Sequence, residues 1–310
     1  MNNNKIYESS LPSIAIIGMG YAGTWLEIQL INNTSTDLTI YEIETHEIRR
    51  GGGIAYGECD IIHQVNLPPE RMYGSDDDKM DYINWLNSAD RSLWPEPFRS
   101  QIGSKTIGAG SGKFPRMLYK IYNSDRLTEA KKKAADRGLN INYVPIMAEA
   151  TAIYENESRT VIHISSMVNS CGKELHVMNV DNGNNNIVIT DIWVASTGHG
   201  PAIVPAFMKN LQKNDRVLID PWCPETSRKM ANRNQTESIL YVGTGMTTYD
   251  MIMLDQKRGH TGKKIMMSRH GDTHFVYKIG DIFEIKQAEI PEAFEKATNK
   301  NELLDGKPGE

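Results

Sequence analysis

The 310-residue sequence has few cysteines and no long apolar run, and both absences exclude classes of protein. Its three cysteines, Cys59, Cys171 and Cys223, lie far apart and form no C-x-x-C pair, which argues against a disulfide framework and a zinc site. No apolar run reaches the roughly 18 residues of a membrane-spanning helix, and the polar start, Met1 to Ser10, does not resemble a signal peptide. We therefore expect a cytoplasmic protein without a metal site or membrane segment.

Neither sign of charge dominates. The 34 Lys and Arg against 39 Asp and Glu give a net charge of −5, so no overall field favours nucleic acid or an anionic membrane. The remaining composition, with 39% hydrophobic residues, 25 glycines and 13 prolines, is that of an ordinary globular protein. We expect a small-molecule substrate, and whether the chain forms a homo-oligomer or joins a partner subunit stays open.

The strongest local signal is a glycine-rich turn near the start. The apolar run Ile14 to Ile17 leads into the pattern Gly18-x-Gly20-x-x-Gly23, and apolar residues at helical spacing follow. In such a turn the glycines allow a tight bend, the approach of a pyrophosphate and close packing of helix on strand. A second apolar run ends at Glu42, 24 residues after Gly18, where a carboxylate would bind a ribose. The pattern predicts a dinucleotide-binding βαβ unit, and a glycine turn that only packs is the alternative.

A second turn of this type follows Ile239 to Val242. It reads Gly243-Thr244-Gly245-Met246-Thr247, with Thr248 in place of the third glycine. After the next strand-like run comes Arg269 and not an acid, and a guanidinium matches the oxygens of a 2′-phosphate. The first turn therefore suits a dinucleotide with a free 2′-hydroxyl and the second suits NADPH. A structural βα turn and a surface arginine without a ligand are the alternatives.

Between the two turns we expect two helices and a meander. The helix Lys79 to Leu86 should bury Met80, and the helix Pro115 to Gly138 should carry a solvated basic face at Lys131 to Lys133. Short alternating runs then predict an antiparallel meander that feeds a last core strand, Ile189 to Ala195. The runs are Ile141 to Val144, Ala150 to Tyr154, Val161 to Ser165, His176 to Val180 and Ile187 to Val194.

Two other patterns yield no site. The stretch Gly108 to Lys113 looks like a phosphate loop, but the full motif would place Ile107 at its first glycine and Phe114 at its hydroxyl, so we do not expect ATP hydrolysis. Four histidines could transfer protons, but no spacing pairs them with a nucleophile or a metal ligand, so no catalytic residue is assigned. They are His63, His199, His270 and His274.

Taken together, these residues resemble the two-dinucleotide flavoproteins, FAD/NAD(P)-binding proteins of the type that includes flavin-dependent N-hydroxylating and related monooxygenases. The resemblance spans about residues 14 to 200 and resumes at 243–250 and 268–271. Besides the two turns, four segments carry it: Gly51 to Gly57, Val65 to Pro68, Phe114 to Tyr119, and Val194 to His199. The implied fold is α/β, a Rossmann-like FAD-binding fold with a parallel sheet and an antiparallel meander, plus a second, short NAD(P)-binding region.

The resemblance implies FAD on the first turn, Ile54 to Asn66 along the flavin, and Thr197-Gly198 near the crossover to the second nucleotide region. We expect an FAD-binding domain at 1–235, an NADPH region at 236–285 and a polar tail at 286–310. The predicted cofactor-binding residues are Gly18, Gly20, Tyr21, Ala22, Gly23, Glu42, Ile54, Ala55, Asn66, Ala150, Thr197, Gly198, Gly243, Thr244, Gly245, Met246, Thr247 and Arg269.

The expected function is that of an FAD-dependent oxidoreductase that uses NADPH, with monooxygenase chemistry as one option. Only 67 residues follow Gly243, so a flavin-binding partner subunit or sensor without efficient catalysis is the first alternative. A dehydrogenase without flavin, with NAD on the first turn, is the second. The run Phe275 to Asp281 resembles a strand that closes the flavin site in relatives, and an ordinary strand and turn is the other interpretation of it.

Overall fold

The computed structural model describes residues 5–268 except 58, 76, 95, 97, 157, 166–185, 200–203, 205–208, 211–213, 215 and 223. Several sequence-based expectations lie outside the described residues: the strand His176 to Val180, Arg269, His270, His274, the run Phe275 to Asp281 and the tail.

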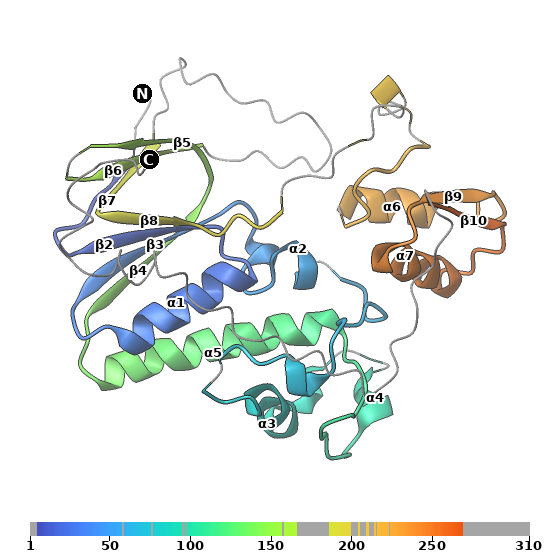
Figure 1. Ribbon diagram of the computed structural model, residues 1–310, viewed down its shortest axis with the longest axis horizontal. Coiled ribbons are helices and arrows are strands. Elements are labelled where there is room, and N and C mark those ends of the chain that lie inside the picture. The colour runs from blue at the N-terminus through green and yellow to red at the C-terminus, as the bar shows by residue number, and fades with distance from the viewer. Residues whose placement is uncertain are drawn as a thin grey trace, which may run out of the picture.

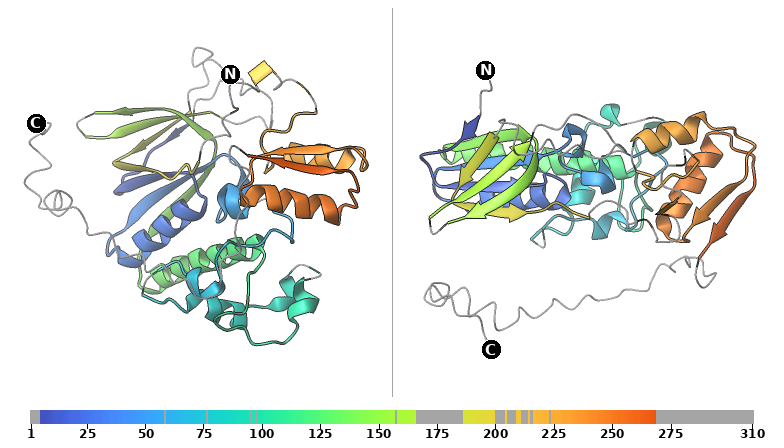
Figure 2. Two further views of the ribbon diagram at one scale, coloured as in Figure 1. Left: turned by 45° about the vertical axis from the view of Figure 1, so that its right-hand side comes forward. Right: turned by 90° about the horizontal axis from the view of Figure 1, so that it is seen from above.

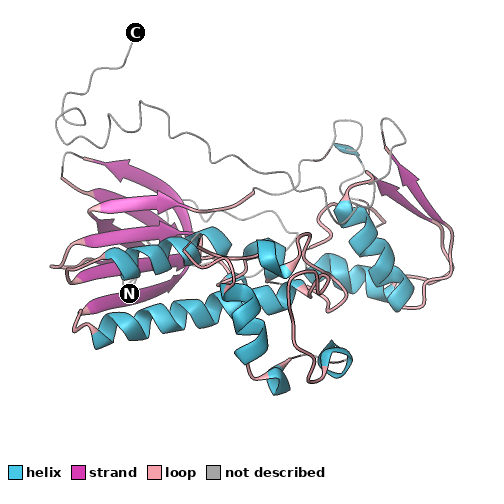
Figure 3. Ribbon diagram, turned by 60° about the horizontal axis from the view of Figure 1, so that its bottom comes forward, coloured by secondary structure: helices cyan, strands magenta, loops and turns pink. Residues whose placement is uncertain are grey.

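A parallel four-stranded sheet forms the centre of the larger part of the molecule (Figure 1). Its strands, in the order β4-β3-β2-β8, are β4 (Ile141–Met147), β3 (Leu38–Glu44), β2 (Ser13–Ile17) and β8 (Ile192–Ala195). Helices α1 (Tyr21–Asn33) and α5 (Arg116–Asp136) lie along one face, and Figure 3 shows them beside the strands. This arrangement confirms the α/β, Rossmann-like fold that the first turn predicts.

An antiparallel sheet covers the other face. It has the order β1-β7-β6-β5, with β1 (Ile6–Tyr7) parallel to β7 (Asn186–Thr190), and with β6 (Thr160–Ser165) and β5 (Glu149–Glu155) antiparallel. Residues of the central strands alternate between two cores, because successive side chains of a strand point to opposite faces. Ile16 and Ile40 pack toward the helices, whereas Ala15 and Tyr41 pack toward the antiparallel sheet.

The prediction of a single strand at Ile189 to Ala195 is wrong, because the chain passes from one sheet to the other within this segment. β7 ends at Thr190 in the antiparallel sheet, and β8 begins at Ile192 in the parallel sheet. Asp191, between them, accepts hydrogen bonds from the backbone N–H of Ser13 at 2.7 Å and from its hydroxyl at 2.9 Å. These two bonds fix the crossover to the start of β2.

Two other element boundaries differ from expectation. β4 continues past Val144 through Pro145, which an edge strand tolerates because its outer N–H groups need no partner. Helix α3 begins only at Asp81 (Asp81–Ser88), so Met80 precedes it and is 46% exposed instead of buried. The residues that α3 buries are Tyr82, Ile83, Trp85 and Leu86.

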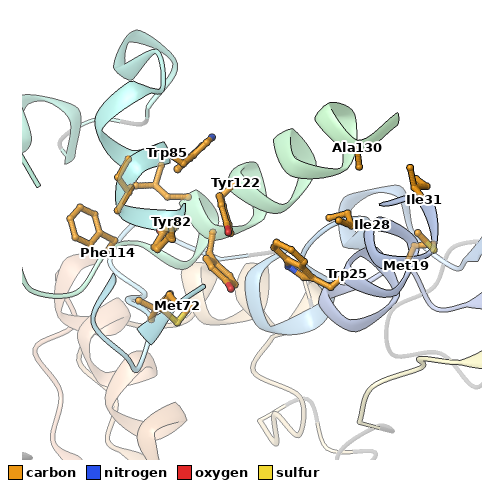
Figure 4. Close-up of a cluster of buried hydrophobic side chains, with 14 of the residues drawn as sticks. Met19, Trp25, Ile28, Ile31, Met72, Tyr82, Trp85, Phe114, Tyr122 and Ala130 are labelled. Carbon is orange, nitrogen blue, oxygen red and sulfur yellow. The ribbon is translucent and has the colours of Figure 1, made fainter. Parts of the chain in front are cut away.

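The segment between β3 and α5 consists of short helices around an aromatic core. They are η1 (Glu47–Arg49), α2 (Gly53–Tyr56), η2 (Pro69–Arg71), α3, η3 (Arg91–Leu93) and α4 (Phe98–Ile102). Figure 4 shows Tyr82, Trp85 and Tyr122 between α3 and α5, and Trp25 next to them on α1. This core ties the segment to the helices beside the sheet. No helix in the described part of the chain is long and apolar enough to cross a membrane.

Four elements form a second unit at the far end of the molecule from the antiparallel sheet (Figure 2). They are α6 (Pro224–Asn232), β9 (Ile239–Val242), α7 (Met246–Lys257) and β10 (Lys264–Met267), and β9 and β10 form a two-stranded parallel sheet. We call them the second unit, and β1 to β8 with α1 to α5 the first unit. Met230 of α6 packs against Met251 and Leu254 of α7, so these two helices share a small core, and the domain boundary expected at 235 stays a prediction.

Candidate functional site

The first glycine turn joins β2 to α1, and each of its glycines lies close to neighbouring backbone. Gly18 has φ +96°, and a Cβ there would lie 2.5 Å from the carbonyl oxygen of Ser196. A Cβ on Gly23 would lie 2.0 Å from the carbonyl oxygen of Gly18, and one on Gly20 would lie 3.1 Å from the Cα of Gly53. The turn therefore requires glycine at Gly18 and Gly23, whereas a Cβ at Gly20 needs a small shift of Gly53.

The N-terminus of α1 is open to an anion. Gly20 is the N-cap and supplies no side-chain hydrogen bond to the helix. The N–H groups at the start of a helix have no partner within the helix, and the helix dipole favours negative charge there. Tyr21, Ala22 and Gly23 begin this helix, so their N–H groups suit a pyrophosphate.

Glu42 does not reach this turn. It lies inside β3, its side chain is only 6% exposed, and it forms ion pairs at 2.6 Å with both Arg50 and Lys131. Lys131 also lies 2.9 Å from Glu27 of α1, which is fully buried. The prediction that Lys131 lies on a solvated face is therefore wrong, because α5 packs the Lys131 side chain against α1 and β3.

Glu44 lies at the place where sequence reasoning put Glu42. Ile17, the last residue of β2, pairs with Ile43, and the N–H of Gly18 donates to the carbonyl of Ile43 at 2.8 Å. The residue of β3 that lies beside the turn is therefore Glu44, the one after Ile43. The Glu44 carboxylate accepts a hydrogen bond from the N–H of Met19, inside the turn, at 2.9 Å. The signal that could have found it is Ile43, an apolar residue after Glu42 that continues the strand to a second acid.

The segment after β3 brings the start of helix α2 to the first turn. Ile54 and Ala55 are exposed on α2, and this helix begins at Gly53, which lies against Gly20. Asn66 is exposed in the loop that follows, next to Val65, whose N–H donates to the carbonyl of Phe114.

The end of β8 packs directly on the turn. The Ser196 hydroxyl donates to the carbonyl of Gly18 at 2.9 Å, and Thr197 and Gly198 follow as exposed residues. Ala150, in contrast, is not brought to the site. It lies on β5 and packs into the core between the two sheets, and the residue beside Glu44 is Ala148, whose N–H donates to the Glu44 carbonyl at 3.1 Å.

The second turn repeats the backbone arrangement of the first. Gly243 has φ +115°, and its N–H donates to the carbonyl of Met267 at 2.7 Å, as that of Gly18 does to Ile43. Gly245 is the N-cap of α7 and, like Gly20, supplies no side-chain bond. At the position of the third glycine, the Thr248 hydroxyl donates to the Gly243 carbonyl at 3.0 Å. Thr244 is half-buried in this turn, and Met246 and Thr247 are exposed after it.

Among the described residues, no catalytic acid or base stands out beside either turn. His63, one of the four histidines considered for proton transfer, is buried, and its Nδ1 accepts a hydrogen bond from the N–H of Asp60 at 3.1 Å. Within the residues that the structure describes, no three His, Cys, Asp or Glu side chains could hold a metal ion together.

Solved structures with a similar fold include two ornithine hydroxylases. An ornithine N-hydroxylase from Kutzneria sp. 744, in a structure with reduced FAD, NADP+ and L-ornithine, has 15% identity and a TM-score of 0.51, over 94% of this chain and 60% of that one. The reduced ornithine hydroxylase PvdA from Pseudomonas aeruginosa has 12% identity and a TM-score of 0.52, over 84% of this chain and 54% of that one. These identities show the fold alone, and the alignments span little more than half of each neighbour's length.

Comparison with curated protein sequences gives no match. A family model described as FAD-NAD(P)-binding matches residues 15–188, which is more than half of the 310 residues. The matched region contains the first glycine turn, Glu44 and α2. The chain therefore belongs to the FAD-NAD(P)-binding family.

Proposed function

We propose that the protein is an FAD-dependent oxidoreductase that uses NADPH and acts on a small molecule. The observation that carries this proposal is the presence of two glycine turns with the same backbone arrangement, each at the N-terminus of a helix without a side-chain cap. A chain that transfers electrons between two dinucleotides needs two such sites.

The residues of the first turn fit FAD. The N–H groups of Tyr21, Ala22 and Gly23 would hold the pyrophosphate, and Glu44 would accept hydrogen bonds from the ribose hydroxyls. Ile54, Ala55, Asn66, Thr197 and Gly198 would lie along the rest of the cofactor. The bound flavin supplies the redox chemistry, and the chain supplies binding, orientation and electrostatics.

The second turn suits NADPH better than NADH. Because the Met267 carbonyl accepts a hydrogen bond from the N–H of Gly243, as the Ile43 carbonyl does from that of Gly18, Ser268 occupies the position that Glu44 holds in the first unit. Ser268 has no carboxylate that would repel a 2′-phosphate. Arg269, whose guanidinium could bind that phosphate, follows Ser268 in the sequence. Gly243, Thr244, Gly245, Met246 and Thr247 would hold the pyrophosphate.

Among flavin reactions, we propose monooxygenation. Support for this class comes from the fold shared with the two ornithine hydroxylases. Without a substrate, a flavin monooxygenase and a flavin reductase would give the same spectrum, so oxygen use needs its own assay. Consumption of NADPH and oxygen in equal amounts, with a hydroxylated product in a screen of small amines, would establish it.

The assignment of the first turn is tested by Gly20→Val. A side chain at Gly20 would press on Gly53, 3.1 Å from its Cβ, and fill the place of the pyrophosphate, while φ stays in an allowed region. We expect a folded variant that has lost FAD, as measured by visible absorption and circular dichroism. The matched control is Gly108→Ala, where a Cβ meets nothing within 4 Å. A folded Gly20→Val protein with wild-type flavin content would remove the assignment.

A further inference from the structure

Arg116, the first residue of α5, forms a buried ion pair between the two units. Its Nη2 donates to Oδ2 of Asp250 on α7 at 2.9 Å, and the two side chains are only 12% and 10% exposed. The same guanidinium donates from Nε to the carbonyl of Gln64 at 3.0 Å and lies over the ring of Trp222, 5.1 Å from its centroid. Arg116 thus contacts α7 of the second unit and Trp222, which packs against Met230, Met251 and Leu254 of that unit, while its bond to Gln64 holds it to the first unit.

The pair connects the two glycine turns through one helix on each side. α5 packs along α1, which begins directly after the first turn. Asp250 lies about one helical turn after Met246, the first residue of α7, which directly follows the second turn. In Figure 1, α7 lies near the end of α5 that faces away from the central sheet. A shift of Arg116 would therefore move one glycine turn relative to the other.

We propose that Arg116 is a positioning residue, which sets the orientation of the second glycine turn toward the first through Asp250. The inference rests on the proposed function, since the distance that matters is that between NADPH on one turn and the flavin held by the other. Reactions between two bound groups are sensitive to small displacements, because the reacting atoms must lie within contact distance in the right orientation.

The contacts require arginine and not only a positive charge. A planar guanidinium can bond a carboxylate and a carbonyl in fixed directions while its face stacks on an aromatic ring, and a lysine ammonium cannot do all three. Arg116→Lys therefore keeps the charge beside Asp250 but loses the fixed directions and the contact with Trp222. This variant separates positioning from simple neutralisation of a buried carboxylate.

The chain offers a matched control pair at the same interface. Lys257 of α7 lies 2.6 Å from Asp60 of the first unit, but the two side chains are 43% and 28% exposed. Exposed ion pairs contribute little, because water and salt screen them. Lys257→Ala thus removes an ion pair between the units without disturbing the buried one.

The experiment measures two properties of purified, FAD-loaded protein: hydrogen exchange of the amides of Gly243 to Asp250, and the single-turnover rate of flavin bleaching at saturating NADPH. With Arg116→Ala we expect faster exchange and a rate between about 10-fold and 100-fold lower, at unchanged FAD content. Arg116→Lys should show the same changes to a smaller degree. Lys257→Ala should stay within about twofold of the wild type on both measurements.

Wild-type exchange and bleaching rate in a folded Arg116→Ala or Arg116→Lys protein would overturn the proposal. If the alanine variant does not fold, the lysine variant decides alone. If NADPH fails to bleach the wild-type flavin, the proposed function is wrong, and the exchange measurement still decides whether Arg116 holds the second turn in place.

Discussion

At the scale of single residues, two acids of one strand have separate tasks. Glu42 and Glu44 lie two positions apart, so both point to the helix side of β3, but α1 and α5 cover Glu42 while Glu44 reaches the glycine turn. The ribose contact proposed for Glu44 and the packing contact of Glu42 should therefore respond differently to the same substitution.

We expect Glu44→Gln to weaken FAD binding by about 10-fold to 100-fold, since hydrogen bonds to a charged group contribute about 1.5–3 kcal/mol. Glu42→Gln should leave FAD affinity near the wild-type value but lower the unfolding temperature, because it breaks the ion pairs with Arg50 and Lys131. Titration of the apoprotein with FAD and thermal unfolding measure the two effects. The reverse pattern would show that Glu42 binds the ribose.

Glu27 predicts a pH effect in the same cluster. Burial, followed by the charge of Glu42, raises the pKa of Glu27 to about 8, and Lys131 opposes this only in part. Tyr143 also faces Glu27 and Glu42, and burial raises the pKa of Tyr143 to about 12. Because the folded state keeps a proton that the unfolded state releases near pH 4.5, stability should fall as the pH rises from there through about 8.

Glu27→Gln keeps a neutral side chain at all pH values, so the free energy of unfolding should decrease less with rising pH in this variant. Urea unfolding at about pH 5.5 and about pH 8 measures this decrease. Glu129→Gln is the control, because its ion pair with Lys133 lowers the pKa of Glu129 and places its titration below this range. Equal slopes in the wild type and Glu27→Gln would contradict a protonated Glu27.

At the scale of elements, the sequence predicts well whatever depends on local pattern. The two glycine turns, the helix at 116–136 and most strands follow from hydrophobic period and from glycine. The switch of sheets at Asp191 could not be predicted, because a bond to Ser13, far away in the sequence, decides it. For the same reason, the end of β3 and the burial of Lys131 depend on packing partners that no local pattern contains.

The loop around His63 contacts α7 and Trp222. The burial of His63 in this contact predicts that stability depends on pH. Burial lowers the pKa of His63 to about 4, despite the opposing charge of Asp60. Because the unfolded state binds a proton near pH 6.5 and the folded state does not, this contribution is complete above about 6.5 and is lost as the pH falls toward 4. The contribution of His63 to the free energy of unfolding amounts to at most about 3 kcal/mol.

His63→Asn should reduce the loss of stability in acid, since the amide oxygen can accept the Asp60 N–H in place of Nδ1. The free energy of unfolding in urea, measured at about pH 5 and about pH 7.5, gives the slope for both proteins. The ring of Trp222 lies 5.2 Å from His63, so its fluorescence reports on the same contact. An unchanged slope would mean that His63 is not held neutral there.

At the scale of the whole molecule, the chain combines a large first unit with a short second one, each with a glycine turn before a helix. The first has the full parallel sheet with helices on one face and an antiparallel sheet on the other. The second has two parallel strands, β9 and β10, and its helix α7 is joined to the first unit by the ion pair of Asp250 with Arg116. The proposed function therefore requires that the second unit binds NADPH and delivers electrons.

The use of NADPH by a bound flavin is tested most directly by the visible absorption spectrum of the purified protein under anaerobic conditions, before and after NADPH and, separately, NADH. The proposed function predicts a flavin spectrum that NADPH bleaches faster than NADH does. A flavin spectrum that neither nucleotide changes would contradict it and would favour a flavin-binding partner subunit or sensor. A protein that stays colourless with added FAD would show that the first turn does not bind flavin.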